Sequence, residues 1–156
     1  MGVVEEFLAE TLPRLEETDK ALHNGNSELR KSMWSHNNPL TLFGAAFTKS
    51  GWDEISPIFD WLASRFSHCE AFTYEVVAAD VSGDLAYIVG IEHTTASIGG
   101  APGAPYSLRV TTIFRREDGA WKVIHRHADP MPESSPESSD ATAEQLHRVL
   151  AERDAQ

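Results

Sequence analysis

The sequence predicts an α+β fold in which N-terminal helices pack on a curved, mostly antiparallel sheet. Two observations carry this prediction. Apolar residues recur at helical spacing up to about residue 66, and at alternating, strand-like spacing from Glu70 onward. Turn-forming dipeptides then divide the second half into long strands. Helices followed by hairpin-linked strands are typical of a domain with helices on one face of an antiparallel sheet.

Three helices and one short strand are predicted in the N-terminal half. Their approximate ranges are 3–22, 27–34 and 51–66 for the helices and 40–43 for the strand. The first helix has one apolar stripe, formed by Phe7, Leu8, Leu12, Leu15 and Leu22. Gly25 can end this helix in a left-handed conformation, and Ser27 is expected to cap the next helix.

Four long strands are predicted in the C-terminal half. They span Phe72–Val81, Leu85–Ser97, Tyr106–Arg116 and Ala120–Ala128. We predict one domain over residues 1–130, because residues 131–156 begin with a Pro-, Ser- and Glu-rich stretch that is typical of a polar linker. The remainder of that tail is expected to form a short helix or to be disordered.

The composition excludes several classes of partner. The 156-residue chain has a net charge of −11, whereas nucleic acids and anionic membrane surfaces bind basic faces. No apolar run approaches the length that spans a bilayer. Cys69 is the only cysteine, and the first nine residues carry Glu5 and Glu6 where a signal peptide would be basic. We therefore expect a cytoplasmic protein without nucleic-acid or membrane partners.

Two strand segments carry a resemblance to a known family. They are GDLAYIVGIE at residues 83–92 and a segment over 109–127 that ends in DGAWKVIHRH. These segments, and the order of elements over roughly residues 5–130, are similar to SnoaL-like proteins of the nuclear transport factor 2-like superfamily. The resemblance implies a cone-shaped fold with the sheet wrapped around the helices, as in ketosteroid isomerase. It implies a pocket for a small hydrophobic organic ligand, and it brings no cofactor and no metal with it.

The turn at Glu117-Asp118-Gly119 decides which polar residues of the last two strands share a face. A three-residue loop, which we prefer, pairs Thr111 with His125 and Arg109 with His127, whereas a two-residue turn shifts this register. With the preferred loop, one face presents a polar set, formed by Arg109, Thr111, His125, His127 and Asp129. The opposite face is apolar, and we expect a homodimer contact there, at Tyr106, Leu108 or Phe114.

Glu92 is the principal catalytic candidate. The expected register of the preceding hairpin places it opposite Phe72, on an apolar face that also carries Tyr74. Burial there raises the pKa of a carboxyl group, as a general base near neutral pH requires. The alternatives are a solvated carboxylate at a strand end and a structural ion pair with Arg109, which would lower the pKa instead.

His125 and His127 alternate along a strand, so their side chains point the same way. As catalytic residues they would transfer protons or stabilise an enolate oxygen. Two further interpretations stay open: hydrogen-bonded structural histidines, and a metal site completed by Asp129. Arg109 would anchor an anionic group of the ligand, or form an internal salt bridge.

The remaining residues expected to contact a ligand are Trp34, His36, Trp61, Phe72, Tyr74, Thr111 and Asp129. His36 lies in the turn where the resemblance places the mouth of the cavity, although no carboxylate occurs there to match the catalytic aspartate of ketosteroid isomerase. The aromatic members of this set could equally belong to the core. His23 and His68 are expected at the surface.

The function that these observations favour is cofactor-independent acid–base chemistry on a hydrophobic, oxygenated small molecule. Isomerisation, dehydration, cyclisation and epoxide opening all fit this description. The alternative is a noncatalytic ligand-binding or assembly module that forms a homodimer. Polar groups that converge in a cavity would favour the enzyme, and a filled cone would favour the module.

Overall fold

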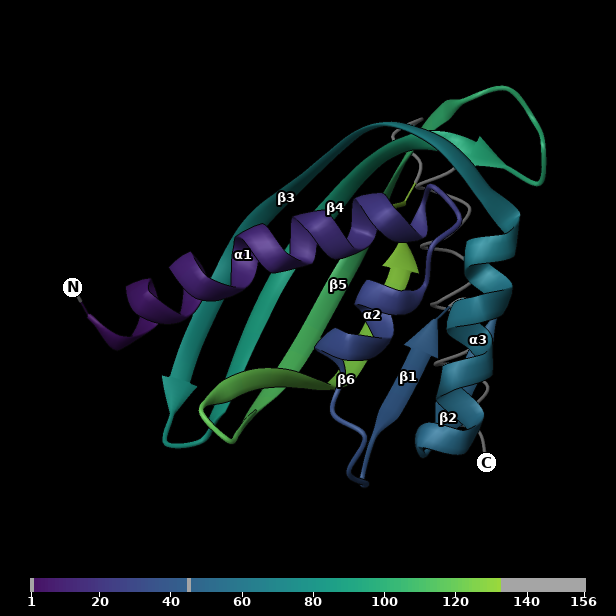
Figure 1. Ribbon diagram of the computed structural model, residues 1–156. Coiled ribbons are helices and arrows are strands. Elements are labelled where there is room, and N and C mark those ends of the chain that lie inside the picture. The colour runs from purple at the N-terminus through teal and green to yellow at the C-terminus, as the bar shows by residue number, and fades with distance from the viewer. Residues whose placement is uncertain (1, 45, 133–156) are drawn as a thin grey trace, which may run out of the picture.

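The computed structural model describes residues 2–44 and 46–132, which fold as three helices on one sheet (Figure 1). The helices are α1 (Val3–Leu22), α2 (Glu28–Met33) and α3 (Trp52–Arg65). The strands are β1 (Thr41–Gly44), β2 (Phe47–Ser50), β3 (Phe66–Ser82), β4 (Leu85–Ile98), β5 (Ala104–Glu117) and β6 (Ala120–Pro130). The predicted α+β class is confirmed. The expected tail beyond residue 132 lies outside the described residues.

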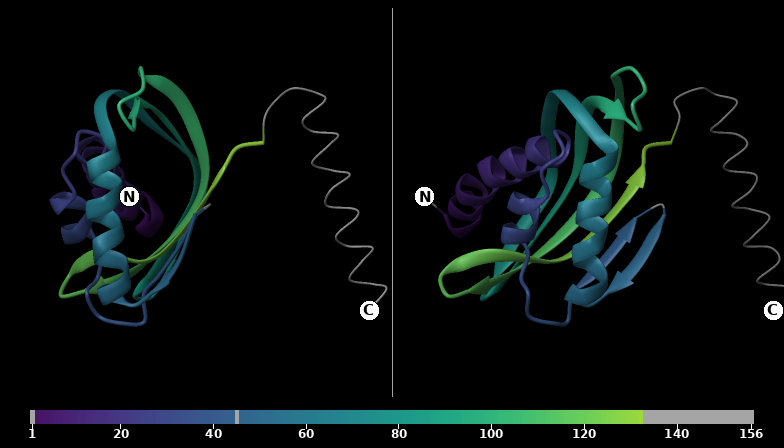
Figure 2. Two further views of the ribbon diagram at one scale, coloured as in Figure 1. Left: turned by 90° about the vertical axis from the view of Figure 1, so that its right-hand side faces the viewer. Right: turned by 45° about the vertical axis from the view of Figure 1, so that its right-hand side comes forward.

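The sheet has the strand order β2-β1-β6-β5-β4-β3. Neighbouring strands are antiparallel except β1 and β6, which pair in parallel. Figure 2 shows the four long strands bending around the helices, with α1 across the concave face and α3 beside the short strands β1 and β2. The sequence did not predict β2, whose four residues are too few to establish an alternating pattern.

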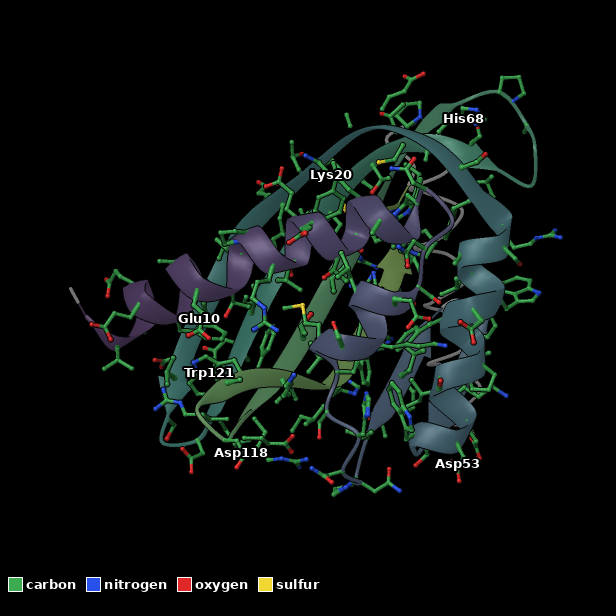
Figure 3. The ribbon with its side chains drawn as sticks, viewed as in Figure 1. Glu10, Lys20, Asp53, His68, Asp118 and Trp121 are labelled. Carbon is green, nitrogen blue, oxygen red and sulfur yellow. The ribbon has the colours of Figure 1, made fainter. Side chains whose placement is uncertain are left out.

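The core fills the space between α1 and the concave face. Phe7 from α1 packs edge-on against Phe114 and Trp121, with both pairs of ring centroids 5.2 Å apart. Figure 3 shows Trp121 beneath the N-terminal half of α1. Burying each aromatic side chain of this kind stabilises the fold by about 1.5–3 kcal/mol. The predicted apolar stripe of the first helix is thus the surface that attaches α1 to the sheet.

The three-residue loop expected between β5 and β6 is wrong. Glu117 pairs with Ala120, so Asp118 and Gly119 alone form the turn, and both have positive φ (50° and 79°), as a type I′ hairpin requires. A β-bulge follows, because Phe114 pairs with Val123 while Ile113 pairs with His125. Ile124 is the extra residue, and it reverses the direction of every β6 side chain beyond it.

The expected register of the β3–β4 hairpin is also wrong, by two residues. Glu92 pairs with Tyr74 rather than Phe72, because the turn is tighter than expected and a bulge lies between Val76 and Ala78. A displacement of two residues keeps each side chain on its face. Phe72, Tyr74 and Glu92 therefore share the concave face, as expected.

The expected Ser27 cap of α2 is also absent. The Ser27 hydroxyl donates a 2.6 Å hydrogen bond to Asp60 of α3 instead, which links the two helices.

Candidate functional site

A cavity of about 300 Å³ lies between the concave face of the sheet, the C-terminal end of α1, and α3. Its outer part is apolar and is formed mainly by Phe43, Phe47, Trp61, Leu62, Phe66 and Leu108. Its floor is polar and is formed by Asp19, His23, Arg30, Glu92, Tyr106 and Arg126. An apolar cavity of this size with a few convergent polar groups is typical of small-molecule sites.

Two buried ion pairs form the charged part of the floor. Asp19 of α1 accepts a short hydrogen bond from Arg30 of α2. Glu92 of β4 accepts two hydrogen bonds from the guanidinium of Arg126 on β6, at 2.7 and 2.8 Å. Asp19 and Glu92 are only 1% and 2% exposed. Such burial is tolerated because each carboxylate has a cationic partner, so the four charges sum to zero.

Arg126 sets the ionisation of Glu92. Burial acts to raise the pKa of this carboxyl group, but the charge and hydrogen bonds of Arg126, together with Arg30, hold the pKa below its ordinary value. The expected raised pKa of Glu92 is therefore wrong. The alternative, an ion pair that lowers this pKa, is observed, but with Arg126 in place of Arg109. Arg109 pairs with Ile91 across the strands and points to the opposite face of the sheet from Glu92.

Asp19 is the floor carboxyl group that titrates near neutrality. Burial and the neighbouring charge of Glu92 raise its pKa to about 6, against the opposing effect of Arg30 and Arg126. A carboxylate with a pKa in this range can accept a proton at neutral pH and release it again. Lys20, the next residue in the chain, lies half-exposed on the outer side of α1 (Figure 3).

His23 and Tyr106 form the uncharged part of the floor. The Nδ1 atom of His23 lies 2.7 Å from the backbone carbonyl of Asp19, and its Nε2 atom lies at short hydrogen-bond distance from the Tyr106 hydroxyl. A carbonyl oxygen can only accept, so Nδ1 carries the proton and Nε2 accepts from Tyr106. Burial lowers the pKa of His23 to about 4, and burial also raises the pKa of Tyr106. Both groups are therefore neutral at pH 7.

The other residues expected to contact a ligand have varied positions. Trp61 lies at the mouth of the cavity and is 50% exposed. Phe72 and Trp34 are buried, and Trp34 packs on Phe59 with ring centroids 5.3 Å apart. The Tyr74 hydroxyl is buried without a hydrogen-bond partner in the described part of the chain. His36 stacks on Trp52 at 3.9 Å, in an exposed position away from the cavity lining.

The polar set of the last two strands does share one face, as expected, but that face is the convex one. Thr111 pairs with His127, and Arg109 with Asp129. These four residues line a shallow depression of about 280 Å³, in which His127 and Asp129 lie 3.1 Å apart. His125 is 2.6 Å from the Thr41 hydroxyl and packs on Phe43. The structure does not bring either histidine to the cavity with Glu92.

Within residues 2–44 and 46–132, no group of three His, Cys, Asp or Glu side chains could hold a metal ion. Among the helices described, none is long and apolar enough to cross a membrane. His68 is exposed at the start of β3, as expected (Figure 3). His23, expected at the surface, is only 4% exposed. Phe114, expected in a dimer contact, is fully buried in the core.

Sequence reasoning missed most of the floor. Asp19 lies four residues after Leu15 and three before Leu22, so a charge on the buried stripe of α1 was a usable signal. Arg126 gave no such signal, because without the bulge at Ile124 it would point to the convex face. Arg30 lies in a six-residue helix that is too short to show a periodic pattern.

Comparison with known proteins supports the fold and the family. The family model of the SnoaL-like domain matches residues 15–132. A putative dehydratase from Streptomyces avermitilis, of the NTF2-like family, is 19% identical, with a TM-score of 0.64 over 81% of this chain and 97% of that one. An NTF2-like protein from Cytophaga hutchinsonii is 12% identical, with a TM-score of 0.63 over 84% and 100%.

A third structure with this fold is the CamKII hub homology domain of Chlamydamonas reinhardtii. It is 21% identical, with a TM-score of 0.60 over 80% of this chain and 98% of that one. No curated protein matches the chain significantly. At these identities the solved structures support the fold, and the family model matches most of the chain. The chain therefore belongs to the SnoaL-like family and has the NTF2-like fold.

Proposed function

We propose that the cavity binds an uncharged, hydrophobic small molecule that carries a carbonyl or hydroxyl oxygen, and that its floor catalyses proton transfer on that molecule without a cofactor. The observation that carries this proposal is the combination of Asp19, with a pKa near 6, and the Tyr106–His23 pair on the floor of one apolar cavity. Isomerisation, dehydration, ring closure and epoxide opening all require such a base and such a donor.

The charge balance of the floor supports an uncharged ligand. Each guanidinium already bonds a carboxylate, so an anionic ligand would have to displace Asp19 or Glu92 from a buried partner. Leaving a buried charge unpaired is costly, whereas an uncharged ligand leaves both pairs intact. The apolar outer part, including Phe47 and Trp61, would bury the hydrocarbon body of the ligand.

The proposed roles follow from the titration of each group. Asp19 is the general base that takes a proton from a carbon or hydroxyl of the ligand. Tyr106 remains protonated and turns its hydroxyl from His23 to the ligand oxygen, where negative charge develops. Glu92, the original candidate for the base, holds Arg126 in place instead. The printed name of the Streptomyces avermitilis protein, a putative dehydratase, is compatible with this class of chemistry.

The test uses 2-tetralone, a bicyclic ketone with exchangeable α-protons. Incubation with the protein in heavy water, followed by NMR, should show faster loss of the α-proton signal than in buffer. Asp19→Asn should lower the protein-dependent rate by about 100- to 10,000-fold. Glu17→Gln is the matched control, because Glu17 is an exposed carboxylate on the same helix, and its rate should equal the wild-type rate. Equal rates with and without wild-type protein would contradict the proposal.

Ligand charge is tested by binding. 2-Naphthol and 2-naphthoate have the same ring system, and calorimetry should show tighter binding of the uncharged 2-naphthol. Tighter binding of 2-naphthoate would contradict the proposed charge selectivity.

The convex face favours a second candidate function, an assembly module. Val77, Leu85 and Tyr87 expose 64%, 49% and 41% of their surface on or beside this face, and exposed apolar patches commonly mark interfaces. We propose a homodimer through this face rather than through Phe114. Sedimentation at micromolar concentration should show a dimer that Tyr87→Glu dissociates, whereas Glu10→Gln, at an exposed position of α1, should leave it intact. A monomeric wild-type protein would contradict it.

A further inference from the structure

A second, much smaller cavity lies behind the charged floor. Its volume is about 10 Å³, and it shares Asp19, Arg30 and Arg126 with the large cavity. Its other walls come from the core side and include Thr18 of α1, Thr112 of β5 and Val123 of β6. The charged side chains thus separate an open cavity that can take a ligand from an internal one that cannot.

The small cavity is narrow, and both polar and apolar residues line it. Thr18, Asp19, Arg30 and Thr112 are all buried, so the space has no wide path to solvent. Its lining includes residues that carry two hydroxyls, one carboxylate and two guanidiniums. A space of about 10–15 Å³ holds one water molecule when two to four polar groups can bond it. Both conditions are met here.

The groups around this space have unused hydrogen-bonding capacity. A guanidinium has five N–H donors, and the Arg30 guanidinium donates one side-chain hydrogen bond, to Asp19, among the described residues. The Thr18 hydroxyl bonds the Met33 sulfur at 3.8 Å, a weak acceptor. Leaving buried donors without partners is costly, and a bridging water removes that cost.

We infer that one buried water molecule occupies this space, bridging the Thr18 and Thr112 hydroxyls to the inner edge of the Asp19–Arg30 pair. The water accepts from Arg30 and donates to the Asp19 carboxylate, so it positions that carboxylate from behind while the ligand approaches from the front. The binding of the water is independent of the proposed function. Its positioning role rests on Asp19 being the base.

Water occupancy is tested on the wild-type protein. Nuclear Overhauser spectroscopy in the rotating frame should show cross-peaks between water and the methyl groups of Val123 and Leu15, which also lines the space. A crystal structure at high resolution should show one ordered oxygen within hydrogen-bond distance of Thr112. Absence of both signals would overturn the inference.

Val123→Ile provides a test with opposite signs for a wet and a dry space. The added methyl group would fill a dry space and raise the melting temperature, because it removes a packing defect. In a wet space it expels the water, leaves the polar walls unpaired and lowers the melting temperature. A higher melting temperature would overturn the inference, whether or not activity changes.

The positioning role is tested with Thr112→Val, which removes one partner of the water without changing the size of the side chain. Loss of the water should raise the titration midpoint of Asp19, measured by carbon NMR of its carboxyl group, because the ionised form loses a donor. Thr11→Val is the matched control. Thr11 lies on α1 with Asp19 but away from the space, and its buried hydroxyl has no partner among the described residues. An unchanged midpoint in Thr112→Val would overturn the positioning role.

Failure of the water and failure of the proposed function are distinguishable. Water cross-peaks together with a slow 2-tetralone exchange would retain the water and remove the function. Fast 2-tetralone exchange without water cross-peaks would retain the proposed function and remove the water.

Discussion

The two faces of the sheet carry similar polar residues in very different states. On the concave face, Glu92 is buried and accepts two hydrogen bonds from Arg126, whose side chain is 12% exposed. On the convex face, His127 and Asp129 lie 3.1 Å apart, and nearly half of each side chain is exposed. Residue types and spacing are therefore poor guides to chemistry, because the surroundings decide how strongly the charges of a pair interact.

The largest expected effect comes from breaking the buried pair. Arg126→Ala leaves the Glu92 carboxylate without its partner in a buried site, and we expect a loss of about 3–5 kcal/mol in the free energy of unfolding. Denaturant titration of the wild-type protein and the variant measures this loss. A loss below about 1 kcal/mol would mean that water reaches Glu92, and the contrast between the two faces would then disappear.

Tyr106→Phe removes a hydroxyl from the floor without disturbing either ion pair. If Tyr106 stabilises charge on the ligand oxygen, the 2-tetralone exchange rate should fall about 100- to 1000-fold, since one such donor contributes that much in other sites. His36→Gln is a suitable comparison, because His36 lies away from the cavity lining. Its rate should not change. A similar fall in both variants would argue against a specific role for Tyr106.

The pH dependence of stability should show two buried groups acting in opposite directions. The raised pKa of Asp19, about 6, means that the folded state holds a proton that the unfolded state has released, so Asp19 favours folding more as pH falls from 6.5 to 5. The lowered pKa of His23, about 4, means that the unfolded state binds the proton first, so His23 disfavours folding over the same range.

Single substitutions should reveal each contribution. As pH falls from 6.5 to 5, the Asp19→Asn variant should lose stability and the His23→Gln variant should gain stability. Urea unfolding at each pH measures both changes. The same sign of slope in both variants would show that at least one of the two pKa directions is wrong.

The smallest expected effect is on the convex face. Asp129→Asn removes the partner of His127 where both side chains are half-exposed, so the free energy of unfolding should change by less than about 1 kcal/mol. The melting temperature in low and high salt measures this change and its screening. A change as large as that of Arg126→Ala would mean that the proposed dimer contact extends from Val77, Leu85 and Tyr87 to Asp129.

The sequence predicted the fold because the fold follows from local patterns. The apolar stripe of α1 and the alternation in β3–β6 identify the elements and their buried faces. The register of β3 and β4 was displaced by an even number of residues, so the face that carries Glu92 was still correct. Only the residue predicted to pair with Glu92 was wrong.

The candidate site was harder to predict because it joins four distant elements. Asp19 and Arg30 meet Glu92 and Arg126 only after the sheet has curved over the helices. Burial then reverses the ordinary expectations, since Asp19 gains a raised pKa and Glu92 a lowered one. No pattern within a single strand or helix contains this information.

The bulge at Ile124 changes which of the following β6 side chains point to the interior. If the same residues paired without a bulge, Ile124 would lie opposite Ile113, and His125 and His127 would lie opposite Thr112 and Val110, both of which point inward. Arg126 would then face outward, and Glu92 would lose its cation. The presence or absence of this bulge therefore selects between an interior with two imidazoles and an interior with a guanidinium–carboxylate pair. Related chains could exchange one chemistry for the other by forming or losing a bulge there, with every turn and helix unchanged.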